Sequence, residues 1–175
     1  MITVAIAAFV ATNIDDLFLL AGWFVRRTPA ANILVGQLVG FSLLVGVSIG
    51  LFLLGTNLPH TAIRWLGILP IAIGVKTLLR DYDGGGESPS SWFSVATVTV
   101  ANGVDNVGVY VPLFLQHRES IPQIIAIFYA GLIVWVIIAK LFERTLALSK
   151  SAHRVAHQLA PVVVILVGII ILLGG

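Results

Sequence analysis

The chain has 175 residues, of which 58% are hydrophobic and only 10% are charged, and its formal net charge is +2 at pH 7. Soluble domains carry about 25% charged residues, so this composition excludes an ordinary soluble domain and indicates a protein embedded in a lipid bilayer. The net charge is too small to indicate a nucleic-acid-binding protein. The absence of cysteine excludes disulfides and thiolate metal sites.

Six apolar stretches are each predicted to form a membrane-spanning helix, since about 20 apolar residues cross the hydrocarbon core. The first stretch has no basic flank of the signal-peptide kind, so we interpret it as a retained helix. The fold class is therefore predicted to be an all-α polytopic membrane protein. The predicted spans are residues 2–25, 33–55, 62–79, 91–116, 121–142 and 157–174.

A linker rich in Gly and Ser, at residues 81–90, divides the chain into halves of three spans each, residues 1–80 and 91–175. Because three is an odd number, the second half enters the membrane from the opposite side, and we predict two inverted three-helix repeats. The acidic positions support this, since Asn13-x-x-Asp16 recurs 89 positions later as Asn102-x-x-Asp105. Coincidence between two apolar segments is the alternative.

The basic residues predict the orientation, because short cytoplasmic loops are enriched in Lys and Arg. Connections 1, 3 and 5 hold most of them, and the opposite side holds only Arg64 and Arg118. We therefore expect an integral protein of a bacterial-type plasma membrane, with both termini outside the cytoplasm. The basic residues on the predicted cytoplasmic side are Arg26, Arg27, Lys76, Arg80, Lys140, Arg144, Lys150 and Arg154.

Three carboxylates lie near the middle of predicted spans: Asp15 and Asp16 in the first, and Asp105 in the fourth. A charged side chain at this depth costs about 2.5–3.5 kcal/mol or more, so such residues usually face a bundle interior and mark an ion pathway. No Lys or Arg lies at the same depth, so bound cations, protons or water must neutralise them. Protonated carboxylates that only link helices are the alternative.

Helical spacing places polar side chains beside these carboxylates. Thr12, Asn13 and Asp16 share one face of the first span, with Asp15 at its edge. By the same spacing, one face of the fourth span holds Thr99, Asn102, Asp105 and Asn106. Carboxylate, amide and hydroxyl oxygens suit hard or borderline divalent cations. We predict that the two spans face each other and hold one cation as a transported substrate, with no resident cofactor. The predicted ligands are Asp16, Asp105, Asp15, Asn13, Asn102, Asn106 and Thr12.

Four blocks recur in an order and spacing typical of one family of membrane proteins: residues 9–17; Gly36 and Gln37 with Gly40; residues 66–71 with Gly74; and residues 105–108 and 110–112 with Phe114. In these blocks the chain resembles the cadmium resistance transporter family, which is grouped with the lysine exporter superfamily. The resemblance implies a membrane protein that exports a divalent metal, cadmium being the named substrate, and that is not an enzyme. The family's acidic positions carry over onto Asp15, Asp16 and Asp105, with Asn106 beside the last.

One position departs from the family pattern. Some members carry Cys before the Gly of the fourth-span block, where this chain has Asn102. Because thiolate favours cadmium and oxygen ligands favour harder ions, manganese, calcium or zinc are alternative substrates. His153 and His157 are four residues apart, and we interpret them as part of a basic flank, with a metal-binding pair as the alternative.

Two further expectations concern mechanism and assembly. Transport is expected to be coupled to protons, since carboxylates in a low-dielectric space readily take them up. The alternative in another class is an intramembrane aspartyl hydrolase, but Asp105 follows Gly103-Val104 rather than the Gly-x-Gly pattern of such enzymes. Six short helices leave little protein around a midplane cavity, so a homodimer is plausible.

Overall fold

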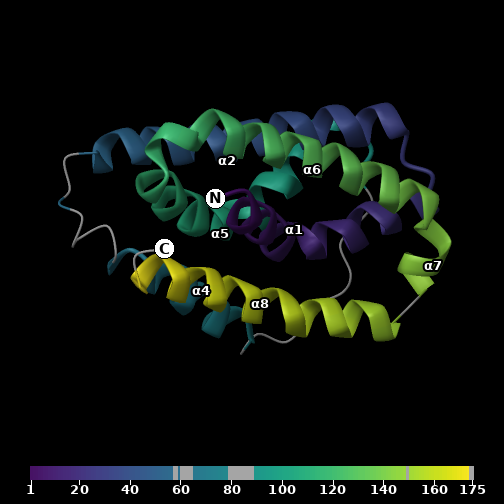
Figure 1. Ribbon diagram of the computed structural model, residues 1–175. Coiled ribbons are helices and arrows are strands. Elements are labelled where there is room, and N and C mark those ends of the chain that lie inside the picture. The colour runs from purple at the N-terminus through teal and green to yellow at the C-terminus, as the bar shows by residue number, and fades with distance from the viewer. Residues whose placement is uncertain (57–58, 60–64, 79–88, 149, 174–175) are drawn as a thin grey trace.

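A computed structural model of the protein describes residues 1–56, 59, 65–78, 89–148 and 150–173, and these residues form helices and no strand (Figure 1). A short 3₁₀ turn at Arg118–Ser120 leads into α6. The α-helices are α1 (Ile2–Val25), α2 (Ala30–Gly55), α4 (Ile68–Leu78), α5 (Trp92–Gln116), α6 (Ile121–Leu141), α7 (Glu143–Leu148) and α8 (Lys150–Leu173).

Three of the described helices are long and apolar enough to cross a membrane: α1, α2 and the stretch Arg118–Leu141 that contains α6. Helix α5 makes a fourth if its two parts, Trp92–Gly103 and Asp105–Gln116, form one span despite the 66° bend between them. Helix α4 and the apolar part of α8, Val164–Leu173, are shorter. The protein is therefore an all-helical membrane protein with three or four helices of spanning length within the described ranges.

The predicted boundaries hold for the first span and differ elsewhere. Helix α2 begins three residues early, at Ala30, because Pro29 with its φ of −58° is already suited to the start of a helix. In the described part of the third predicted span, Trp65 is helical, a turn follows at residues 66–67, and α4 begins at Ile68. The connection between the fifth and sixth predicted spans, residues 143–156, is helical where the structure describes it, because α7 and the first turns of α8 occupy it.

Helix α1 runs through the inside of the bundle, between α6 and α8 (Figure 1). Helix α5 packs along α2, and α4 packs along α8. A buried aromatic cluster joins the α1–α6 pair to the α2–α5 pair. The ring centroid of Phe128 on α6 lies 4.4 Å from that of Tyr110, 6.1 Å from that of Phe9 and 6.4 Å from that of Phe41. Such aromatic pairs each contribute about 0.5–1.5 kcal/mol beyond the area they bury. The cluster thereby fixes α1, α2, α5 and α6 relative to one another.

Glycines allow two of these helix pairs to approach closely. A Cβ atom added at Gly40 of α2 would lie 2.8 Å from the Cβ atom of Thr99 on α5 and 2.9 Å from the carbonyl oxygen of Ala96. One added at Gly131 of α6 would lie 2.6 Å from the ring of Phe9 on α1. Small residues at such crossings allow membrane helices to gain close van der Waals contact.

The first prediction concerns this α2–α5 contact. Replacing Gly40 with Ala should lower the free energy of unfolding by about 1–3 kcal/mol, because the added methyl group meets backbone and a β-branched side chain that cannot retreat. Reversible unfolding in mixed micelles measures the change. Gly46→Ala on the same helix is the matched control, since nothing lies within 4 Å of its added Cβ atom. Equal destabilisation by both substitutions would contradict this packing.

Candidate cation site

The polar segment of α1 is turned toward the interior of the bundle. Asn13 is 4% exposed and Asp16 is 7% exposed, although the helix around them is apolar. Thr12 and Asp15, beside them in the sequence, are half-buried. The polar face that the spacing predicts for α1 is therefore the face that helix α5 crosses.

Asn102 of α5 contacts both carboxylates of α1. Its Nδ2 atom donates to Oδ1 of Asp16 at 2.6 Å and to Oδ2 of Asp15 at 3.2 Å. The donor is a neutral amide, so it satisfies the carboxylate oxygens without supplying a positive charge. These two carboxylates, adjacent in sequence, thus present oxygens to the same point on the neighbouring helix.

A second group of contacts lies further along the same helix crossing. Nδ2 of Asn106 donates to Oδ1 of Asn13 at 3.4 Å, and Nδ2 of Asn13 donates to the Tyr110 hydroxyl at 3.0 Å. The Thr12 and Tyr110 hydroxyls lie 3.2 Å apart. Later residues of α1 meet earlier residues of α5, so the two helices cross in antiparallel directions. Buried amide and hydroxyl groups are thereby paired with one another, as a low-dielectric interior requires.

Two residues of this network, Tyr110 and Trp135, are not among those predicted from the sequence. Tyr110 follows Asn106 by four residues on α5, and this spacing is a usable signal for a shared face. The indole Nε1 of Trp135, on α6, donates to the backbone carbonyl oxygen of Asn13 at 2.7 Å. Trp residues near span ends commonly anchor in the interface, so sequence alone gives no sign that this one reaches the interior.

Asp105 stands apart from the other two carboxylates. It is half-buried, and among the described residues no side chain donates a hydrogen bond to it. Across the described ranges, no three His, Asp or Glu side chains gather closely enough to hold a metal ion. The row Asn102, Asn106 and Tyr110, at intervals of four residues, is turned toward α1, and Asp105 lies about 100° around the helix from Asn106.

The predicted polar face of α5 is also divided. Thr99 is buried against Gly40 of α2 and donates to its own helix, to the carbonyl oxygen of Val95 at 2.9 Å. The 66° bend separates the part of α5 that ends at Gly103 from the part that holds Asp105 and Asn106. The side chains of His153 and His157 lie outside the described residues, so the structure does not test their interpretation.

The described helices are apolar and three of them are long enough to span a membrane, which defines an integral membrane protein of the helical class. A family model described as cadmium resistance transporter matches residues 9–175, nearly the whole chain. The chain therefore belongs to the cadmium resistance transporter family, and the resemblance noted in the sequence is confirmed. Among curated proteins and among solved structures, the searches give no match. Membership places it in a transporter family rather than an enzyme family, with a metal cation as substrate.

The second prediction tests the network around Tyr110. Replacing Tyr110 with Phe should lower the free energy of unfolding by about 1–2 kcal/mol, because the hydrogen bonds of its hydroxyl with the Asn13 amide and the Thr12 hydroxyl are both lost. Tyr129→Phe is the matched control and should change it by less than about 0.5 kcal/mol. Its hydrogen-bond partner, Ser42, is exposed. Without the Tyr129 hydroxyl, Ser42 can donate to a backbone carbonyl oxygen of its own helix, as Ser48 does to Leu44. The free energy of unfolding of both variants is measured in the same micelles. Equal losses for Tyr110→Phe and Tyr129→Phe would contradict a special role for Tyr110.

Proposed function

We propose that the protein exports a divalent metal cation and binds it at the contact between α1 and α5. The observation that carries the proposal is that Asp15 and Asp16 both accept hydrogen bonds from Asn102 where the antiparallel helices α1 and α5 cross. Buried carboxylates in a membrane protein are costly to maintain and usually mark a transport pathway. A bound cation would supply the charge that the neutral amide does not.

Asn102 has the chemistry to respond to an arriving ion. In this structure its N–H donor occupies the position on the two carboxylates that a cation would take. Rotation of the amide about its terminal bond would replace Nδ2 with Oδ1 and convert a donor into a ligand. Asn13, Asn106 and Thr12 are the further oxygen ligands we propose around Asp15 and Asp16. Asp105 completes the site only after a movement of α5, and the bend beside Gly103 offers the place for it.

We also propose that residues 1–80 and 91–175 are inverted repeats of three spans each, joined by the linker 81–90. Packing supports this, because α2 meets α5 through Gly40 and Thr99, while α6 meets α1 through Gly131 and Phe9. The two glycines are 91 positions apart and their partners are 90 positions apart, close to the offset of 89 between the acidic motifs. An exchange of the two halves therefore maps one contact onto the other.

Inverted repeats provide a mechanism for alternating access. Rocking one half against the other would expose the α1–α5 contact first to one side of a bacterial-type plasma membrane and then to the other. Protons neutralise the carboxylates once the metal has left, which couples export to proton entry. In this scheme six spans place both termini outside the cytoplasm. A homodimer stays a prediction from the sequence.

Cadmium is the proposed substrate by family membership. The oxygen ligands at this site also suit manganese, calcium or zinc, since the position that can supply a thiolate is Asn102 in this chain. Substrate choice therefore depends on one side chain that already touches both carboxylates of α1.

The third prediction concerns the carboxylates. Asp16→Asn and Asp105→Asn should each abolish metal transport by reconstituted proteoliposomes while leaving expression largely intact, because each removes a charge that the cation needs. Asp15→Asn should have a milder effect, since its contact with Asn102 is the longer one. Glu119→Gln, in the exposed turn before α6, is the control and should transport normally. Full activity of Asp16→Asn would rule out this site.

The fourth prediction concerns selectivity. Asn102→Cys should raise the ratio of cadmium to manganese transport severalfold, because a soft thiolate then stands beside two carboxylates. Asn102→Ser is the matched control, of similar size but with a hard oxygen in place of sulfur. Parallel flux measurements with the two metals give the ratio. An equal ratio for the Cys and Ser variants would show that Asn102 does not contact the ion.

A further inference from the structure

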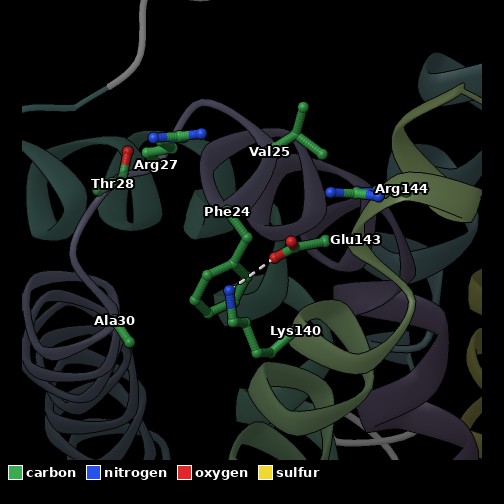
Figure 2. A pocket seen from close by; sticks show the side chains of 8 residues that line it. All are labelled: Phe24, Val25, Arg27, Thr28, Ala30, Lys140, Glu143 and Arg144. Atoms are coloured by element: carbon green, nitrogen blue, oxygen red, sulfur yellow. Dashed lines mark hydrogen bonds and ion pairs between the residues drawn. The ribbon is translucent and has the colours of Figure 1, made fainter.

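A second polar site lies at the far end of the bundle from the N-terminus of α1. A cavity of about 460 Å³ opens between the end of α1, the start of α2 and the junction of α6 with α7 (Figure 2). This volume is within the usual range of small-ligand sites. Its charged lining is mostly basic, which would repel a metal cation, so it is distinct from the proposed transport site. The lining residues are Phe24, Val25, Arg27, Thr28, Ala30, Lys140, Glu143 and Arg144.

The charges in this cavity do not balance. Nζ of Lys140 lies 2.8 Å from Oε2 of Glu143 and also 5.0 Å above the ring of Phe24, so this pair is neutralised internally. Figure 2 shows the pair with Arg27 on one side and Arg144 on the other. Within the described ranges, neither arginine forms an ion pair with a carboxylate. Two guanidinium groups therefore line the cavity in excess of its one acid.

The backbone at Arg27 is an independent sign that this side chain is needed. Arg27 has a φ of 62°, in the left-handed region, and it is the one non-glycine residue with a positive φ among those described. Its N–H donates to the carbonyl oxygen of Phe24, and the N–H of Thr28 donates to that of Trp23, which is the Schellman pattern that ends α1. Glycine is the usual residue at this position, since a Cβ atom is disfavoured there. Strained residues of this kind gather at ligand sites.

We propose that this cavity binds a phosphate group, held between the guanidinium groups of Arg27 and Arg144. The planar fork of Arg matches the oxygens of phosphate with paired hydrogen bonds. The site lies at the end of spanning helices, beside the exposed apolar side chains of Val25, Leu141 and Phe142, which give acyl chains a surface to follow. Basic pockets between membrane helices commonly hold the headgroups of anionic lipids. Free phosphate offers the same chemistry, and the experiment below separates the two sources.

The test uses the full chain, purified in a neutral maltoside detergent and titrated in a calorimeter with three ligands. These are dihexanoyl phosphatidylglycerol, dihexanoyl phosphatidylcholine and inorganic phosphate. The variants are Arg27→Gly and Arg144→Gln, and Arg118→Gln at the opposite end of the bundle is the matched control. Because a φ of 62° suits glycine, the thermal midpoint of Arg27→Gly should not fall below that of the unmodified protein. Loss of binding by this variant is then not a folding defect.

The unmodified protein should bind phosphatidylglycerol about tenfold more tightly than phosphatidylcholine, and each cavity variant should lose about tenfold of that affinity, equivalent to one guanidinium–phosphate contact. Arg118→Gln should bind normally. Binding of phosphatidylglycerol alone supports a lipid headgroup, and binding of inorganic phosphate with the same dependence on the two arginines supports a free anion. Equal binding of the two lipids without phosphate binding would overturn the proposal. So would unchanged affinity for phosphatidylglycerol in both Arg27→Gly and Arg144→Gln.

Discussion

The amide of Asn102 donates to the carboxylates of Asp15 and Asp16, and this contact between α1 and α5 is the constraint on which the rest of the bundle depends. Two adjacent acids on an apolar helix require a partner helix that brings polar atoms to the same depth. Helix α5 does so in the antiparallel direction. The Asn106–Asn13 contact and the Tyr110 hydroxyl extend the pairing along the crossing.

Apolar packing around the contact holds it in place without adding charge. Gly40 and Gly131 bring α2 onto α5 and α6 onto α1, and the aromatic cluster joins all four helices. Trp135 then ties α6 directly to the backbone of Asn13. The charged residues around the cavity at Arg27 lie at the bundle end, so the metal site proposed within the membrane and the phosphate site proposed at its surface occupy regions of opposite charge.

The sequence predicts the parts of this structure that depend on burial. A long apolar run gives α1 its bounds, and the cost of placing acids inside that run singles out Asp15 and Asp16. The sequence does not predict the rotation of α5 about its own axis. A rotation of about 100° decides whether Asn106 or Asp105 faces α1, and the hydropathy of the sequence is the same in both cases. Residues 143–148 show another limit. Hydropathy indicates which residues contact lipid. The Glu, Arg, Leu and Ala residues of α7 favour a helix whether or not lipid surrounds them.

The most direct test of the cation site is an anomalous-scattering map from crystals of the protein soaked in cadmium and, separately, in manganese. The account predicts one strong peak within coordination distance of the Asp15 and Asp16 carboxylates, at the crossing of α1 and α5, with the Asn102 amide turned to present its oxygen. A map in which both metals leave this crossing empty and bind only at surface carboxylates such as Glu119 or Glu143 would contradict it.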